Sequence, residues 1–552
     1  MKPYIWKYIG LSLLSAILFS LPWRLPAVGW LLLFAFIPLF WIEADFAARK
    51  AKGGWKYYAL AFLLWNAITT YWIYKATLWG GITAVVANAF QMFFIFSLFC
   101  LVKRKTTPKI GYTFLVALWI AWEYLYFNAE ISWPWLVLGN GFSNTTFLVQ
   151  WYEYTGVLGG SLWVFLTNIS LFWWLRRKPE GRVARYCLNA SLAALLVLPA
   201  GISVYRFYTY QEAGAPIEVV VLQPNIDPYK EKFSGMTQEE QDLRLLELAT
   251  EAIRPGTRYL FAPESFVGNV LENNMLNDSS FKRFYQFLQD HPHTVLIVGA
   301  ISTYFYPVGA EAPTETAKQI GDGRWYDYFN AAFQLSDGVQ PFVYHKSKLV
   351  PAAEKQPYAK YLKWLNRLAI DLGGTVGTFG TQSKASIFPA PWNRDASDSL
   401  SPLYIGVAIC YESVYGEYFS SYVQRGAGLM SVITNDGWWG NLPGYRQHLS
   451  YSRLRAIETR RCIARSANTG ISALINQRGD YIEKSAWWEE AWLRGDLHVN
   501  HKLTFYVRYG DWIGRISTYL LLLLLGYGLV LWSNSRVARK NQRAVKQRGR
   551  RD

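Results

Sequence analysis

Three side chains of different chemistry stand at or near the ends of apolar runs. Cys410 ends the run 404–410, Glu264 follows the run 259–262, and Lys346 lies in the stretch 342–350. Apolar runs of this length predict buried strands. A thiol, a carboxylate and an ammonium can act as nucleophile, general base and partner for a developing oxyanion. The three together predict a covalent acyl-transfer site.

The polar part of the chain alternates strand-like and helix-like segments, which predicts an α/β layered domain with largely buried strands. Helices are expected over residues 237–252, 280–289 and 446–467, and strands over residues 217–223, 259–262, 294–299, 327–335, 342–350, 403–410, 428–434 and 471–476. Sites in such sheets collect at the carboxyl ends of strands. Glu264 alone fits a turn or helix cap, and Lys346 alone fits an exposed cation. With Cys410 and Asn435-Asp436 at further strand ends, a functional site is favoured.

The composition indicates a membrane protein. The chain has 552 residues, of which 17% are aromatic and only 17% are charged, and its mean hydropathy is +0.05. Segments that approach the ~20 residues needed to cross a bilayer are expected at residues 8–22, 28–42, 57–74, 79–102, 110–127, 159–175, 186–205 and 516–532. The first two are short, and the Pro-containing joint between them also allows a re-entrant hairpin.

Basic loops predict the orientation, because positive side chains are retained on the cytoplasmic side. Clusters of Lys and Arg follow the second, fourth and sixth apolar segments and the last one. The polar block then lies outside. We expect a transmembrane domain of about seven helices over residues 1–207, an external catalytic domain over residues 208–512, a last transmembrane helix over residues 513–534 and a basic cytoplasmic tail over residues 535–552.

The net charge of +17 does not indicate nucleic-acid binding, because the basic tail adjoins a predicted span, where anionic headgroups explain it. No module that reads nucleic acid is recognisable. Among the cysteines, Cys100 and Cys187 fall in or beside predicted spans, which leaves Cys410 and Cys462 in the external domain. These two can form a disulfide, but the position of Cys462 in a predicted helix favours packing.

A set of short motifs runs through the external domain. They are Gln223-Pro-Asn-Ile226, Pro263-Glu264-Ser265, Lys346-x-x-Leu-Val-Pro-x-x-Glu354, Cys410-Tyr411-Glu412-Ser413, Asn435-Asp436-Gly-Trp-Trp-Gly440 and Arg453-x-Arg455-Ala456 leading to Asn468-Thr469-Gly470. These motifs, together with the order of spans, external domain, last span and basic tail, resemble the apolipoprotein N-acyltransferase family of the nitrilase superfamily. The resemblance covers nearly the whole chain and implies a nitrilase-like αββα sandwich inserted between transmembrane helices.

The resemblance also implies an activity. It implies an acyltransferase of the bacterial inner membrane, with the catalytic domain facing the periplasm. Cys410 would carry the acyl group as a thioester, with Glu264 as general base and Lys346 beside the oxyanion. The implied donor is a phospholipid that gives its sn-1 chain, and the implied acceptor is the N-terminal amine of the diacylglyceryl-cysteine of an apolipoprotein. No cofactor is implied, and the six His residues show none of the usual metal-ligand spacings.

Residues beside the three reactive groups have two interpretations each. Glu354 and Glu412 either tune or orient the charges of Lys346 and Cys410, or are ordinary exposed acids. Tyr411 either supplies an orienting hydroxyl or packs at the end of its strand.

Aromatic residues and one acid are candidates for contact with lipid. Trp438 and Trp439 suit a lipid interface or the mouth of an acyl groove, or else fold onto their own domain. Phe233 is matched with an aromatic residue of the family's lipid loop. Glu123 is the only acid well inside an apolar segment, and either has a function there or reaches the outer interface.

Two other functions fit parts of the sequence. A membrane-anchored nitrilase-type amidase would use the same thiol and pass the acyl group to water, although seven spans exceed what an anchor needs. A transporter or receptor with an inactive outer domain is the non-enzymatic alternative, but the predicted spans offer few polar groups and no charge pairs for a translocation path. The partners that the resemblance implies are a phospholipid, a diacylated apolipoprotein and membrane lipids.

Overall fold

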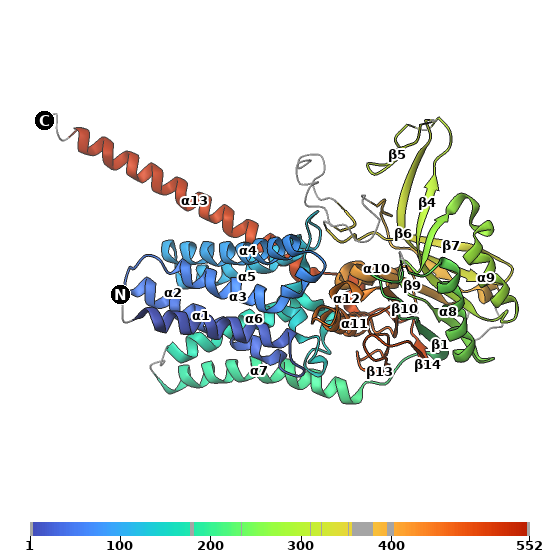
Figure 1. The fold of residues 1–552 in the computed structure, drawn as a ribbon. Coiled ribbons are helices and arrows are strands. Elements are labelled where there is room, and N and C mark those ends of the chain that lie inside the picture. Colours follow the sequence, from blue (N-terminus) through green and yellow to red (C-terminus); the bar gives the residue numbers. More distant parts are fainter. Residues whose placement is uncertain are drawn as a thin grey trace.

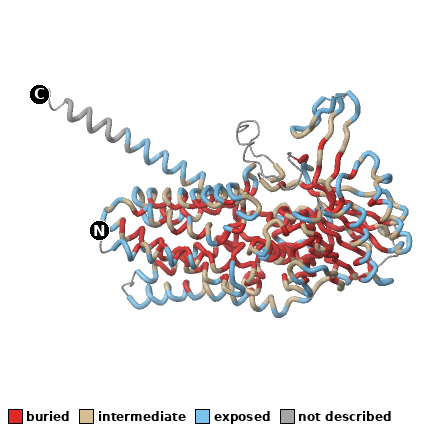
Figure 2. Tube along the Cα trace, viewed as in Figure 1, coloured by how far each residue is buried: buried red, intermediate tan, exposed pale blue. Residues whose placement is uncertain are grey.

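The computed structural model describes residues 4–176, 181–232, 235–309, 311–321, 323–351, 353–355, 379–394 and 402–548. A bundle of long helices and an α/β domain lie end to end, and the N-terminus lies at the end of the bundle away from the α/β domain (Figure 1). Buried residues continue from the bundle into the α/β domain (Figure 2). One hydrophobic cluster contains residues of both, including Trp135 of the bundle and Tyr411 and Tyr451 of the α/β domain. The two parts therefore share a core.

The helical part accounts for all eight apolar segments that the sequence predicts. Its helices are α1 (Ile5–Ser20), α2 (Ile37–Ala48), α3 (Trp55–Thr70), α4 (Leu78–Lys105), α5 (Pro108–Tyr126), α6 (Tyr152–Arg176), α7 (Arg182–Thr209) and α13 (Trp512–Arg548). Six stretches in the described residues are long and apolar enough to cross a membrane: Ile5–Trp23, Gly29–Ala48, Leu78–Lys105, Tyr152–Arg176, Arg182–Thr209 and Trp512–Asn534. Helices α3 and α5 are outside this set and pack against α4.

Aromatic rings fill the interior of the bundle. The ring of Phe36 lies 4.7 Å from the centroids of Phe19 and Phe165. One feature contradicts the expectation of spans without charge pairs, because the fully buried carboxylate of Glu43 on α2 pairs with Lys103 near the end of α4.

The connection between α5 and α6 folds back into the bundle. It contains the short helices η5 (Pro134–Leu136), η6 (Leu138–Phe142) and η7 (Thr146–Leu148). Glu123 on α5 is fully buried, and its Oε1 accepts hydrogen bonds from the Leu138 N–H (2.9 Å) and the Trp119 indole (3.1 Å). The expectation that Glu123 reaches the outer interface is therefore wrong. Its carboxylate binds the loop between α5 and α6 inside the protein.

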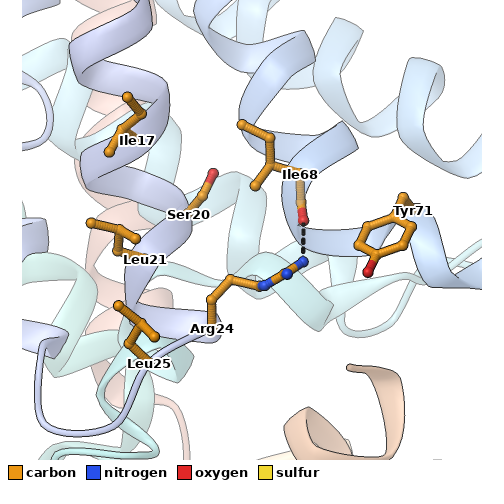
Figure 3. Close-up of a pocket in the computed structure, with 7 residues that line it drawn as sticks. All are labelled: Ile17, Ser20, Leu21, Arg24, Leu25, Ile68 and Tyr71. Carbon is orange, nitrogen blue, oxygen red and sulfur yellow. Dashed lines mark hydrogen bonds between the residues drawn. The ribbon is translucent and has the colours of Figure 1, made fainter. Parts of the chain in front are cut away.

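A groove of about 520 Å³ lies between α1 and α3 (Figure 3). Its lining is apolar except for Ser20, Tyr71 and Arg24, whose guanidinium donates to the Ile68 carbonyl at 3.3 Å. The neighbouring Trp23 indole donates to the Tyr451 hydroxyl at 2.9 Å. This corner of the bundle is thus joined directly to the α/β domain.

Two mixed sheets form the α/β domain. The first has the order β14-β1-β2-β4-β6-β5, with β3 paired to β4 and β7 to β6, and the second has the order β13-β12-β11-β10-β9-β8. The strands of the first are β1 (Ala215–Gln223), β2 (Thr257–Phe261), β3 (Val267–Leu271), β4 (Val295–Phe305), β5 (Lys318–Gln319), β6 (Trp325–Ser336), β7 (Val339–His345) and β14 (Ala491–Val499). Those of the second are β8 (Ile387–Pro389), β9 (Tyr404–Ile409), β10 (Leu429–Thr434), β11 (Ile463–Ala467), β12 (Ala473–Ile475) and β13 (Tyr481–Lys484).

Helices cover the outer face of each sheet, so the expected αββα sandwich is confirmed. An apolar layer between the sheets joins residues such as Val219 and Val432, and a second layer packs the first sheet on α8 (Gln238–Ala252) and α9 (Ser279–Gln289). The helices α10 (Gly416–Gln424) and α11 (Gly444–Thr459) lie by the second sheet, and α11 also contacts α6 of the bundle. The short α12 (Phe505–Tyr509) precedes α13.

One predicted helix is wrong over its last eight residues, 460–467. The helix expected to continue to residue 467 ends at Thr459, Arg460 turns left-handed with φ 50°, and strand β11 begins at Ile463. Cys462 therefore lies just before a strand rather than inside a helix. It is buried, and neither Cys462 nor Cys410 forms a disulfide.

Candidate active site

Cys410 occupies a tight turn between strand β9 and the short helix η11 (Cys410–Val414). Its φ angle is 51°, in the left-handed region that residues other than glycine rarely adopt. The turn is held on both sides, because the Ile409 N–H donates to Glu412 Oε2 (2.8 Å) and the Ser413 hydroxyl donates to the Cys410 carbonyl (2.7 Å). Backbone strain that the surroundings hold in this way favours a functional role for Cys410.

Glu264 lies just past β2 and is 6% exposed. Its Oε1 accepts hydrogen bonds from Lys346 Nζ (2.9 Å) and Asn330 Nδ2 (2.8 Å), and its Oε2 accepts from the Asn435 N–H (3.2 Å). These donors belong to β6 and to the ends of β7 and β10, on both sheets. The main chain at Glu264 packs directly against Gly299. Only glycine leaves room for this contact, because a Cβ at position 299 would lie 2.6 Å from the Glu264 Cα.

Lys346 follows β7 and is buried between two carboxylates. Its ammonium donates to Glu264 Oε1 and to Glu354 Oε1 (2.8 Å). Burial alone would lower the pKa of Lys346, but the negative charges of Glu264 and Glu354 outweigh it and raise the pKa well above the usual value. Lys346 is thus a permanent cation at neutral pH, with its position fixed by both acids.

The thiol of Cys410 shares this environment. Burial raises the pKa of Cys410 well above the usual value, the charge of Glu264 raises it further, and the charge of Lys346 opposes both. The thiol is therefore protonated in the resting site. A protonated thiol needs a base before it can act as a nucleophile, and Glu264 is the acidic group whose charge acts most strongly on this thiol.

Glu354 lies beside Lys346, as an orienting role requires. Its Oε1 accepts from both Lys346 and Asn330, and its Oε2 accepts from the Val350 N–H (2.8 Å). The main-chain bond fixes the carboxylate, and the carboxylate in turn fixes the ammonium.

Glu412 is fully buried, which rules out the exposed-acid interpretation. Its Oε1 accepts from the Tyr344 hydroxyl (2.6 Å) and the Ser347 N–H (2.6 Å), and its Oε2 accepts from the Ile409 N–H and the Tyr422 hydroxyl (3.1 Å). These bonds join the main chain just after Lys346 to the main chain just before Cys410. Glu412 therefore acts on both residues through the backbone.

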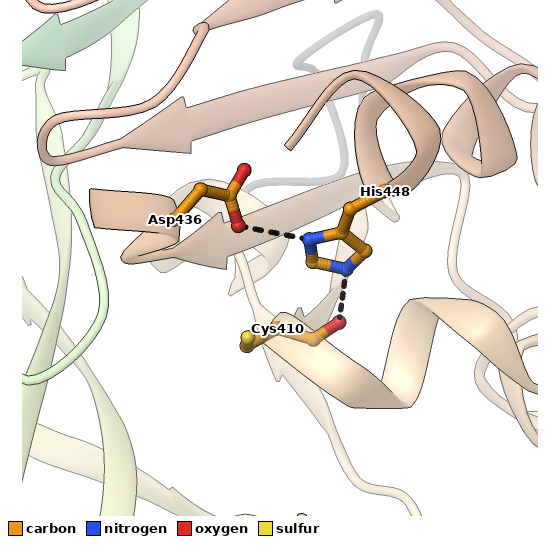
Figure 4. Close-up of side chains that lie close together, drawn as sticks. All are labelled: Cys410, Asp436 and His448. Carbon is orange, nitrogen blue, oxygen red and sulfur yellow. Dashed lines mark hydrogen bonds and ion pairs between the residues drawn. The ribbon is translucent and has the colours of Figure 1, made fainter. Parts of the chain in front are cut away.

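Two contributors lie outside the strand ends that the sequence singled out. Asn330 in the middle of β6 donates to both Glu264 and Glu354. His448 on α11 lies between Asp436 and Cys410 (Figure 4). The sequence around Asn330 and around His448 shows no motif that would mark either residue as functional. The only sequence signal close to His448 in the structure was the motif that contains Asp436.

The group Cys410, Asp436 and His448 has ligand atoms within 4.8 Å of one another, which raises the possibility of a metal site. The donor set does not fit one. Arg465 Nη2 donates to Asp436 Oδ2 at 2.7 Å and lies 3.1 Å from His448 Nδ1. A divalent cation would sit against this guanidinium, and the cation that balances Asp436 is already present.

The aromatic candidates fall at the junction of the two parts. Trp439 packs with its ring centroid 4.7 Å from Trp72 and 6.1 Å from Trp135, both of the bundle. Trp438 packs against Tyr229 in the loop after β1 (5.3 Å). Trp439 thus packs both onto the bundle and onto its own domain, where its ring centroid lies 5.9 Å from that of His448. Phe233 lies outside the described residues.

Two family models match the chain. The one described as apolipoprotein N-acyltransferase N-terminal domain covers residues 15–170, and the one described as carbon-nitrogen hydrolase covers residues 219–500. The chain is 29% identical to the apolipoprotein N-acyltransferase of Chlorobaculum tepidum, over 83% of this chain and 84% of that protein. It is 28% identical to that of Geobacter metallireducens, over 91% of each chain. A solved structure of a Saccharomyces cerevisiae nitrilase-superfamily member covers 51% of this chain and 90% of its own, at 14% identity and a TM-score of 0.36.

Proposed function

Because the chain belongs to the apolipoprotein N-acyltransferase family, we propose that it transfers a fatty acyl chain from a phospholipid to the N-terminal amine of a diacylated apolipoprotein. The observation that carries the proposal is the ion pair of Glu264 and Lys346, whose charges both act on the partly exposed thiol of Cys410, in a domain that shares its core with a membrane bundle. Such a site can receive a donor from the lipid phase and an acceptor that is itself anchored in lipid.

In the first half-reaction Glu264 takes the thiol proton and the sulfur attacks the sn-1 ester carbonyl. Lys346 and the main-chain N–H of Tyr411 stabilise the negative oxygen of the tetrahedral intermediate, and one such donor contributes about 2.7–4 kcal/mol. The carbon–oxygen bond to glycerol then breaks, and Glu264 returns the proton to the glycerol oxygen. Lysophospholipid leaves, and the acyl group stays on Cys410 as a thioester.

In the second half-reaction the α-amino group of the diacylglyceryl-cysteine attacks the thioester. Glu264 takes a proton from the attacking nitrogen, and the same donors stabilise the oxyanion. The carbon–sulfur bond breaks and the proton passes to the sulfur, which restores the thiol and releases the amide. An amine reacts slowly with an ester. Passing the acyl group through a thioester on Cys410 divides this difficult transfer into two easier steps.

We place the α/β domain, residues 208–512, on the periplasmic side of the bacterial inner membrane, with the transmembrane domain over residues 1–207, the last span over residues 513–534 and the tail over residues 535–552. Helix α6 contacts α11, is 25 residues long and ends at Arg176, and α4 ends with Lys103, Arg104 and Lys105. The basic ends support this orientation, because positive loops stay in the cytoplasm.

The test uses the purified full chain in phospholipid vesicles with a labelled sn-1 chain and a synthetic diacylated lipopeptide. We expect labelled N-acyl peptide, lysophospholipid and an acyl adduct on Cys410, all lost in Cys410→Ala. Release of free fatty acid with no N-acyl peptide would instead support the hydrolytic, amidase-type alternative. No acyl adduct with any phospholipid would refute the thioester route.

A further inference from the structure

We infer that His448 is a positioning residue for the nucleophile, an inference that rests on the proposed function. The imidazole lies between the Asp436 carboxylate and the main chain of Cys410 (Figure 4). Its Nε2 is 3.1 Å from the Cys410 carbonyl oxygen, and its Nδ1 is 2.9 Å from Asp436 Oδ1. His448 therefore links a buried carboxylate to the peptide group that follows the reactive sulfur.

The carboxylate that holds His448 is itself fixed. Asp436 accepts hydrogen bonds from Arg465 on Oδ2 (2.7 Å) and from the Thr434 hydroxyl on Oδ1 (2.9 Å). The side chains of Asp436 and His448 are 1% exposed, and that of Arg465 is fully buried. Burial alone would raise the pKa of Asp436, but Arg465 and His448 lower it to about 2. A charged, immobile carboxylate can hold the ring in one orientation.

Both ring nitrogens of His448 are engaged away from the thiol. Nδ1 faces Asp436 and Arg465, and Nε2 faces the Cys410 carbonyl and the Ser413 hydroxyl (3.0 Å). An imidazole can take a proton only through a nitrogen that accepts a hydrogen bond from the donor. Glu264 therefore keeps the role of base, and the contribution of His448 is geometric.

The geometric effect follows from the planar peptide between Cys410 and Tyr411. In a trans peptide the carbonyl and the N–H point in opposite directions. A Cys410 carbonyl held by His448 on α11 thus aims the Tyr411 N–H away from α11, toward the side where the proposed mechanism places the oxyanion. The turn depends on such support, because the φ angle of Cys410 is 51° and an unsupported chain would relax from it.

Two amide substitutions of the same residue separate this role from a purely structural one. Glutamine puts an amide nitrogen at the position of Nε2, where it can donate to the Cys410 carbonyl, whereas asparagine puts one at the position of Nδ1, beside Asp436. We expect H448Q to form the acyl-enzyme within about 10-fold of the wild-type rate and H448N to lose about 100-fold, the loss typical of one misplaced oxyanion donor. The apparent KM for phospholipid should stay within about 2-fold in both.

His498 supplies the matched control. It lies on β14, and its Nδ1 contacts a main-chain oxygen, that of Gly214 (2.9 Å), at an exposed position. H498Q and H498N should both keep the wild-type rate. Equal rates for H448Q and H448N, or a faster H448N, would overturn the inference. Should neither His448 variant fold, Ser413→Ala removes the other donor to the same carbonyl, and a wild-type acylation rate in that variant would overturn it as well.

A p-nitrophenyl acyl ester separates failure of this inference from failure of the proposed function. Acylation by this ester needs the thiol and the oxyanion donors but no phospholipid. We expect the burst of nitrophenol to fall in the order wild type, H448Q, H448N. If the wild-type protein gives a normal burst but forms no acyl-enzyme from phospholipid, the proposal that phospholipid is the acyl donor is refuted. The order of the burst amplitudes in the variants still tests the role of His448 in that case. A burst that is the same in wild type, H448Q and H448N refutes the role of His448, whether or not phospholipid acylates the protein.

Discussion

The phenolic hydroxyl of Tyr411 donates a 2.8 Å hydrogen bond to the main-chain carbonyl of Ser132, in the loop that follows helix α5 of the bundle. The residue after Cys410 is therefore hydrogen-bonded to the bundle. Tyr415 repeats the connection, with its hydroxyl 2.6 Å from the Ser132 side chain, and the Trp133 ring stacks 6.2 Å from that of Tyr411. The hydroxyl of Tyr411 is thus hydrogen-bonded and its ring is packed, and the orienting role stays a prediction.

This connection predicts that Tyr411→Phe will weaken transfer more than it weakens folding. The change leaves the buried Ser132 carbonyl without its phenol donor, which costs about 1–3 kcal/mol of unfolding free energy. It also frees the turn that presents the thiol, and we expect acyl-enzyme formation to slow by about 10-fold or more. Rapid-quench acylation and thermal unfolding of the same preparations measure the two effects.

Tyr285→Phe is the control for that variant. Tyr285 on α9 donates the same kind of bond, to the Val339 carbonyl at 2.8 Å, but far from the thiol along the first sheet. It should lose similar stability and keep its rate. If Y285F and Y411F slow acylation equally, the link to the bundle has no part in presenting the thiol.

The charges at the thiol predict opposite shifts in its titration. Burial and the negative charge of Glu264 raise the pKa of Cys410, whereas the positive charge of Lys346 lowers it. Glu264→Gln removes a negative charge, so the thiolate should form at lower pH than in wild type. Lys346→Met removes a positive charge, so the thiolate should form at higher pH.

These shifts are measured by alkylating Cys410 with iodoacetamide at a series of alkaline pH values and quantifying the labelled peptide by mass spectrometry. A background lacking the exposed Cys187 avoids competing label. Shifts of both variants in the same direction would show that the two charges do not act on the sulfur as the geometry requires.

The positions of Cys410 and Glu264 at strand ends could be predicted from the sequence. Both residues end apolar runs, and buried strands with helices between them leave few other ways to fold. The motifs then predicted the family and the αββα sandwich, and both were confirmed.

The rest of the site depends on contacts between residues distant in sequence. Asn330 reaches Glu264 from another strand, and nothing in its neighbours marks it. The end of α11 was misplaced because Arg460 adopts a left-handed conformation at a position without the glycine that usually signals a helix end. Strand β14 was not predicted, because its polar residues at Arg494, Asp496 and His498 resemble a loop.

The position of Asn330 predicts that Asn330→Leu, a change that preserves volume, will slow acylation. The amide donates to both carboxylates that hold Lys346. Without it we expect about 1–3 kcal/mol less stability and about a 10-fold slower acylation, because Glu264 loses a bond that fixes its position. Gln334→Leu is the control on the same strand, since Gln334 donates to the Pro389 carbonyl at 2.7 Å. Loss of rate in Q334L as large as in N330L would contradict the prediction.

The contacts of Glu412 predict that one substitution disturbs the turns carrying Cys410 and Lys346 together. Every contact described for its carboxylate is with a donor: the N–H groups of Ile409, Ser347 and Lys348 and the hydroxyls of Tyr344 and Tyr422. Glu412→Gln replaces one oxygen by an NH₂ group, and because each oxygen accepts from at least one main-chain N–H, this NH₂ faces an N–H donor in either orientation of the amide. We expect about 1.5–3 kcal/mol less unfolding free energy and a loss of about 100-fold in acylation, since Cys410 and Lys346 both shift.

Two results distinguish this coupling from general destabilisation by Glu412→Gln. Glu417→Gln on α10 removes a carboxylate whose ion pair with Arg515 is partly exposed, so it should cost little stability and no activity. In Glu412→Gln the rate should remain low at temperatures where thermal unfolding shows the protein fully folded. Recovery of the wild-type rate in the folded variant would mean that the carboxylate only stabilises the domain, and that the turns carrying Cys410 and Lys346 keep their geometry without it.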